Sequence, residues 1–248
     1  MHLAILMTNT DESAFAQAHP KDGEKFTALI HGVRPDWTCG VFSVKDGVFP
    51  DDLAAFDGII VTGSPASVHD GEPWIDRLLE TLREIVGRNI PLFGACFGHQ
   101  AIALALGGKV ERNPGGWVFG LARADVVDPA PWMEPLGREL AQYGAHIEQV
   151  TKLPEGARVL IGSAACPAGG FAIGERVYTT QNHPEMTPGF IAALVEEYAE
   201  KLPADVIEKA RASLADEADY RDFAETIARF FEQAASPGRA SRRRPANP

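Results

Sequence analysis

Short runs of consecutive apolar residues alternate with a stretch of helical periodicity in the first part of the chain. The apolar runs are residues 4–7, 41–44, 58–62 and 89–95. Between the last two, residues 73–87 repeat apolar side chains at the spacing of an amphipathic helix. Short, predominantly apolar runs are typical of strands buried on both faces. The pattern therefore predicts strand–helix–strand units and a mostly parallel central sheet covered by helices.

The rhythm changes after residue 108. Strand candidates then follow one another without long helices between them, at residues 109–110, 120–127, 158–161, 171–173 and 177–181. They predict a small antiparallel extension of the same domain. Helical periodicity returns at residues 188–201, 204–214 and 217–234. We therefore predict one α/β domain over residues 1–234, with C-terminal helices over about 188–234. A disordered basic tail at residues 235–248 would follow, where periodicity is absent.

Composition and charge narrow the class of protein. Hydrophobic residues make up 45% of the chain and charged residues 23%, and the formal net charge is −11. So acidic a surface repels nucleic acids and anionic membranes, and no apolar run is long enough to cross a bilayer. The three cysteines show neither a CxxC motif nor metal-ligand spacing. We expect a cytoplasmic protein with reduced thiols, no metal, and no nucleic-acid or membrane partner.

The segment around Cys96 has the pattern of a nucleophile elbow. An apolar strand runs into a cysteine flanked by Gly94 and Gly98, and a helix begins at once. Such a turn exposes one side chain, and small neighbours permit its sharp backbone. The helix dipole would favour a thiolate here, and the N–H of Phe97 would face a developing oxyanion. The alternative is a buried, unreactive cysteine at the end of a strand.

A second segment offers a partner for such a thiol. His183 and Glu185 flank Pro184, and residues two apart in an extended segment project from the same face. A carboxylate beside an imidazole fixes its tautomer and supports its protonated form. A cysteine nucleophile needs such a base. The alternative is a strand-to-helix junction in which Glu185 stands early in the helix.

Together the two segments resemble the class I, triad-type glutamine amidotransferases. Residues 94–100 match the G-x-C-x-G-x-Q elbow of that family, and residues 183–185 match its H-P-E motif. Residues 58–68 resemble its strand and oxyanion loop. Residues 146–157 resemble the H-x-D-x-V…LPEGA segment of its stand-alone and GMP-synthetase-like members. The resemblance covers about residues 40–190 and implies a flavodoxin-like, three-layer α/β fold.

The resemblance also implies roles for individual residues. The implied catalytic triad is Cys96, His183 and Glu185. The implied oxyanion-hole donors are the backbone N–H groups of Phe97, Gly63 and Ser64. The implied substrate-binding residues are Gln100, Trp117 and Val118. The positions that depart from the family pattern include Ser64, Thr179 and Asn182. They bear on the shape of the substrate, since none of them removes a triad member.

The resemblance implies two kinds of enzyme with the same chemistry. A glutaminase or amidotransferase would attack the γ-carboxamide of glutamine and form a γ-glutamyl thioester. A γ-glutamyl peptidase would use the same triad on other γ-glutamyl amide bonds. About 60 residues follow the H-P-E motif, without an acceptor domain or a nucleotide-binding motif. We therefore expect no cofactor, a small-molecule substrate, and a synthetase partner in trans if the chain is an amidotransferase. A non-catalytic regulatory module on the same fold is the third hypothesis.

Overall fold

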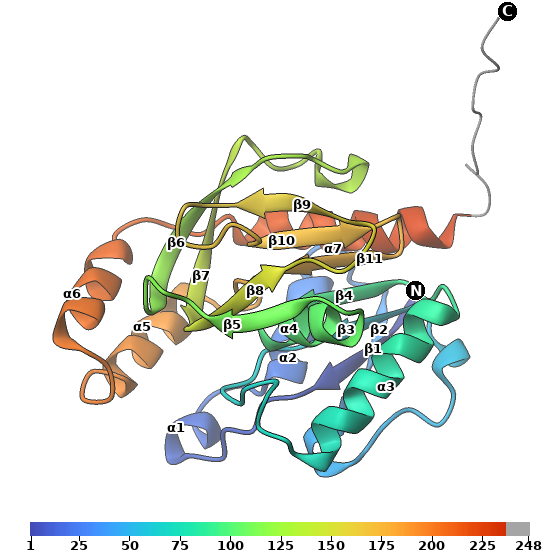
Figure 1. The fold of residues 1–248 in the computed structure, drawn as a ribbon, viewed down its shortest axis with the longest axis horizontal. Helices are drawn as coiled ribbons and strands as arrows, with labels where there is room; N and C mark the ends of the chain where they lie inside the picture. Colours follow the sequence, from blue (N-terminus) through green and yellow to red (C-terminus); the bar gives the residue numbers. More distant parts are fainter. Residues whose placement is uncertain (237–248) are drawn as a thin grey trace, which may run out of the picture.

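The computed structural model describes residues 1–236, and the main sheet of this region begins with a parallel half (Figure 1). Its strands, in spatial order, are β2 (Thr38–Ser43), β1 (His2–Met7), β3 (Gly58–Val61), β4 (Leu92–Ala95) and β11 (Val177–Thr180). Neighbouring strands in this half are all paired in parallel. The carboxyl ends of β3, β4 and β11 therefore meet at one edge, which is where ligands bind in open α/β sheets.

The second half of the same sheet is antiparallel. It continues from β11 through β10 (Gly170–Ile173), β9 (Ala157–Gly162), β6 (Val118–Val126) and β7 (Glu139–His146). A separate antiparallel pair is formed by β5 (Lys109–Arg112) and β8 (Glu148–Lys152). The predicted α/β class, with its parallel sheet and antiparallel extension, is thus confirmed.

Helices cover both faces of the parallel half because its strands are apolar on both faces. Leu6 and Val61 pack toward α3 (Pro73–Gly87) and α4 (Phe97–Ala105) on one face. Ile60 packs on the other face, toward the two helices α2 (Asp22–His31) and α7 (Tyr220–Ala235). The remaining helices are α1 (Ala14–Gln17), α5 (Pro188–Glu197) and α6 (Ala204–Ser213). None of the helices within residues 1–236 is long and apolar enough to span a membrane.

Several predicted bounds need correction. The second strand covers Thr38–Ser43, so Val44 begins a short 3-10 turn instead of ending a strand. Helix α5 stops at Glu197 rather than 201, and residues 198–202 form turns and a bend before Pro203. Helix α7 extends to Ala235, one residue into the predicted tail. The rest of that predicted tail, from residue 237, lies outside the described residues.

Candidate active site

Cys96 occupies a sharp turn between β4 and α4. Its backbone has φ 49° and ψ −107°, a positive-φ conformation that is costly for a residue with a Cβ and that is often found at active sites. Gly94 and Gly98 are required by close packing around this turn. A Cβ on Gly94 would lie 2.8 Å from the carbonyl oxygen of Gly98, and a Cβ on Gly98 would overlap the carbonyl oxygen of Val61. The structure thus forms the predicted elbow.

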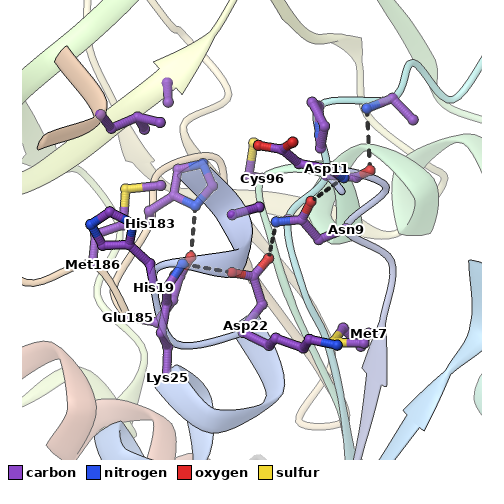
Figure 2. A pocket seen from close by; sticks show the side chains of 18 of the residues that line it. Met7, Asn9, Asp11, His19, Asp22, Lys25, Cys96, His183, Glu185 and Met186 are labelled. Carbon is purple, nitrogen blue, oxygen red and sulfur yellow. Dashed lines mark hydrogen bonds and ion pairs between the residues drawn. The ribbon is translucent and has the colours of Figure 1, made fainter. Parts of the chain in front are cut away.

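His183 and Glu185 lie just beyond the end of β11, next to Cys96 (Figure 2). The backbone N–H of His183 donates to the Tyr143 carbonyl oxygen at 2.8 Å, which fixes the position of the His183 backbone. The Nδ1 of His183 is 2.8 Å from Oε1 of Glu185, whose side chain is 1% exposed. A carboxylate oxygen accepts here, so Nδ1 carries the proton and donates it. The other ring nitrogen is then free to exchange a proton with the thiol.

The charge of the site favours a protonated His183. Burial alone would lower the pKa of this imidazole. Negative charge on the Cys96 sulfur and on the Glu185 carboxylate opposes that effect, as do hydrogen bonds from His183 to both groups. The pKa of His183 is raised well above its usual value as a result. A protonated imidazole stabilises negative charge on a neighbouring sulfur, and such charge makes a cysteine nucleophilic.

The loop after β3 closes the other side of Cys96. A Cβ on Gly63 would lie 2.7 Å from Cε1 of His183, so only glycine fits there. Ser64 is accommodated because its Oγ accepts the N–H of Ala66 at 3.2 Å. In residues 1–236 the N–H groups of Gly63, Ser64 and Phe97 donate to no protein acceptor. They are therefore free to donate to a ligand, and their role as oxyanion-hole donors stays a prediction.

Thr8, at the end of β1, anchors this loop and was not predicted as a site residue. Its hydroxyl donates to the Gly63 carbonyl oxygen at 2.9 Å or to that of Thr62 at 3.1 Å. Its N–H donates to the Thr62 hydroxyl at 3.0 Å. Thr8 and Thr62 are fully buried. No sequence motif marks Thr8, because its partners lie 54 and 55 residues away.

The comparisons with known proteins agree with this geometry. A family model described as glutamine amidotransferase class-I matches residues 39–195. The chain belongs to the class I glutamine amidotransferase family. The predicted recognition is thereby confirmed, and members of this family are enzymes.

Individual relatives carry two kinds of name. Gamma-glutamyl peptidase 3 of Arabidopsis thaliana is 31% identical over 164 residues, which are 63% of this chain and 66% of that protein. A glutamine-hydrolyzing GMP synthase of Pseudomonas fluorescens is 34% identical over 178 residues, which are 66% of this chain but only 32% of that protein. The crystal structure of a Thermotoga maritima glutamine amidotransferase has the same fold, with a TM-score of 0.71 and 19% identity over 94% of this chain and 97% of that one.

A cavity of about 510 Å³ opens from the family's elbow toward the N-terminal segment. Cys96, His183, Gly63 and Ser64 all border it. Of the three predicted substrate contacts, Gln100 and Trp117 also line the wall. Val118 does not: it lies in β6, where its side chain packs against Gly144 of β7.

The far wall of the cavity comes from parts of the chain that the family motifs do not mark. Figure 2 shows Asn9 between Asp11 and Asp22, with Lys25 below. Asn9 donates to Asp22 at 2.8 Å, and Lys25 forms an ion pair with Asp22 at 2.9 Å. The Lys25 ammonium also lies 3.5 Å from the ring centre of Phe190 in α5. Charged and aromatic groups thus face the triad across the cavity.

Two further histidines differ in their position relative to the cavity. His146 borders the cavity and bonds through Nδ1 to the Glu148 carbonyl oxygen at 3.0 Å, while burial lowers its pKa to about 4. Its Nε2 is buried without a partner in the described part of the chain. His99 lies away from the cavity and bonds to the Thr179 hydroxyl at 2.8 Å. Burial lowers the pKa of His99 to about 3, so this ring stays neutral and acts as a hydrogen-bonding group in the core.

The structure also explains one departure from the family pattern. Thr179 is fully buried, and its hydroxyl donates to the Phe171 carbonyl oxygen at 3.1 Å while accepting the Phe171 N–H at 3.1 Å. The His99 ring completes this cluster. Glycine at position 179 would leave the Phe171 backbone groups and the His99 ring without their hydrogen-bond partner. Thr179 therefore stabilises the core and does not shape the cavity.

Proposed function

We propose that this chain hydrolyses γ-glutamyl amide bonds through a thioester on Cys96. The proposal is carried by one observation, the placement of Cys96 and the hydrogen-bonded pair His183–Glu185 together on the wall of one cavity. In the first step the Cys96 sulfur attacks the γ-carbonyl carbon, and the carbonyl oxygen becomes an oxyanion. The N–H groups of Phe97 and of the Gly63 loop would donate to that oxyanion.

His183 moves the protons in both halves of the reaction. It takes the thiol proton and gives it to the leaving nitrogen as the carbon–nitrogen bond breaks. Water then attacks the thioester, His183 takes a proton from that water, and the sulfur leaves as glutamate is released. Glu185 orients the ring throughout, because its carboxylate holds Nδ1. These steps need no metal and no cofactor.

Glutamine is the smallest γ-glutamyl amide that this site would cleave, and the GMP synthase relative supports it. In that case a synthetase in trans would use the released ammonia. One observation favours larger γ-glutamyl compounds as a second candidate. The cavity of about 510 Å³ falls within the roughly 300–1,000 Å³ of pockets that hold drug-sized ligands. The gamma-glutamyl peptidase relatives agree with this candidate. We place the enzyme in the cytoplasm, where a catalytic thiol stays reduced.

Purified protein given glutamine and, separately, glutathione tests the proposal. Ammonia from glutamine would identify a glutaminase, and a released dipeptide would identify a γ-glutamyl peptidase. Cys96→Ser is the catalytic control and Cys39→Ser the matched one, because Cys39 lies in β2 on the far side of β1 and β3. Activity retained by Cys96→Ser would refute the mechanism. A folded protein inactive on a wide panel of γ-glutamyl compounds would favour the regulatory-module hypothesis.

A further inference from the structure

Gln181 lies beside Cys96 because of the register between two strands. Thr180 pairs with Ala95 in the parallel ladder of β11 and β4, so Gln181 and Cys96 are the next residues on adjacent strands. The Cys96 N–H donates to the Thr180 carbonyl oxygen at 2.9 Å. The Gln181 side chain is fully buried, and its Nε2 lies 3.8 Å from Sγ of Cys96, within hydrogen-bonding distance for sulfur.

A second amide fixes the orientation of Gln181. Gln100 donates through Nε2 to the Glu148 carbonyl oxygen at 2.9 Å and to Oε1 of Gln181 at 3.3 Å. The carbonyl oxygen only accepts, so the nitrogen of Gln100 must face it and meets Gln181 as a donor. Gln181 therefore presents its oxygen to Gln100 and its NH₂ group to Cys96. The reversed amide would set two NH₂ groups against each other and an oxygen against the sulfur.

We propose that Gln181 stabilises the Cys96 thiolate by donating an N–H to its sulfur, and that Gln100 is the positioning residue that aims this donor. The inference rests on the proposed function only in taking Cys96 as the nucleophile. The thiol proton moves to His183, and Gln181 exchanges no proton. A hydrogen bond to an ionised acceptor is stronger than one to a neutral acceptor, so the donor favours thiolate over thiol. Gln181 thereby raises the fraction of reactive sulfur at a given pH.

Alkylation of Cys96 by iodoacetamide as a function of pH measures this effect without any substrate. Gln181→Met keeps the length of the side chain and removes the donor. We expect alkylation about tenfold slower at pH 6, a profile displaced by about one pH unit to higher pH, and an unchanged limiting rate at high pH. Gln181→Glu should be slower still, because a carboxylate would face the thiolate. Gln142→Met is the matched control: Gln142 is equally buried, but its amide accepts from Thr180 and does not touch the sulfur.

A folded Gln181→Met protein with the wild-type profile would overturn the proposal. An equal slowing at every pH would also overturn it, because a purely structural disturbance scales the curve without displacing it. If Gln181→Met does not fold, Gln100→Met decides, since loss of the positioning amide should displace the profile in the same direction by less. An undisplaced profile there refutes the inference. A protein without γ-glutamyl hydrolase activity would still give an alkylation profile, so the two proposals fail separately.

Discussion

Substituting Gly63 by alanine tests whether the loop and the triad are matched in shape. The added Cβ would lie 2.7 Å from Cε1 of His183, whereas ordinary contacts begin at 3.4 Å. The loop cannot retreat freely, because Thr8 holds the Gly63 carbonyl oxygen and Thr62 accepts the N–H of Gly98 at 3.0 Å. The imidazole of His183 must therefore move by about 0.7 Å, the difference between these two distances.

The displacement has a calculable effect on the reaction. A misplacement of about 1 Å in a catalytic group can cost about a hundredfold in rate. We expect Gly63→Ala to lower kcat/KM by about 10- to 100-fold, which is about 1.4–2.7 kcal/mol of transition-state stabilisation. The free energy of unfolding should fall by about 1–3 kcal/mol, as for other overpacked sites. The fold should therefore survive while the catalytic geometry does not.

The assay compares initial rates of γ-glutamyl hydrolysis with the unfolding midpoint of each variant. Gly87→Ala is the matched control, because a Cβ at that position meets nothing within 4 Å. It should retain both the wild-type rate and the wild-type stability. A folded Gly63→Ala enzyme with the wild-type kcat/KM would show that His183 tolerates the crowding. The close approach of Gly63 to His183 would then play no part in the reaction.

Three other measurements follow from the structure. Cys96 should be alkylated faster than Cys39 and Cys166. Burial and the charge of Cys96 raise the pKa of Cys166 to about 12, and burial also raises the pKa of Cys39. Equal alkylation rates of the three cysteines in peptide mapping would contradict this prediction. The pKa of His99 is about 3 in the folded protein and 6.5 in the unfolded chain. Below pH 6.5 the unfolded chain therefore binds a proton at His99 that the folded protein does not bind. The free energy of unfolding should then fall by about 1.4 kcal/mol per pH unit, while above pH 6.5 this residue causes no loss. His99→Gln should flatten this loss in urea titrations at pH 7 and pH 5, and an unchanged loss would exclude His99 as its source. Thr8→Val, an isosteric change, should release the oxyanion loop and lower kcat/KM several-fold at an unfolding cost of about 1–3 kcal/mol; wild-type kinetics would show that the loop needs no anchor.

Elements with a regular hydrophobic pattern could be predicted from the sequence, and α3 was predicted at its observed bounds. The elements α1, α2, β7 and β8 were not predicted. Strand β7 is buried along most of its length yet contains Gln142 and His146, so it shows neither alternation nor an apolar run. Tertiary contacts make this burial possible: Gln142 accepts from the Thr180 hydroxyl at 2.9 Å, and His146 bonds to Glu148. The pattern of hydrophobic and polar residues cannot predict hydrogen-bond partners that come together only in the folded chain.

The candidate site divides in the same way. The elbow and the H-P-E segment are local, so their geometry could be read from a few consecutive residues. The groups around them depend on contacts between distant segments. Gln181 stands beside the sulfur only because of the β11–β4 register, and Thr8 reaches the loop only because β1 pairs with β3. A single sequence does not specify which residues of two strands pair, which is why both residues were missed.

Strand register also explains why the three functional segments meet. Val61 of β3 pairs with Gly94 of β4, and Ala95 of β4 pairs with Thr180 of β11. The three strands therefore end at nearly the same level of the sheet. The residues that follow each strand lie around Cys96. The elbow turns the sulfur into the space between the two outer segments, since a Cβ on Gly63 would lie 3.5 Å from the Cys96 Cβ. A shift of one residue in either pairing would reverse the faces of that strand. It would withdraw the oxyanion loop or the base, so the pairing that builds the core also builds the site.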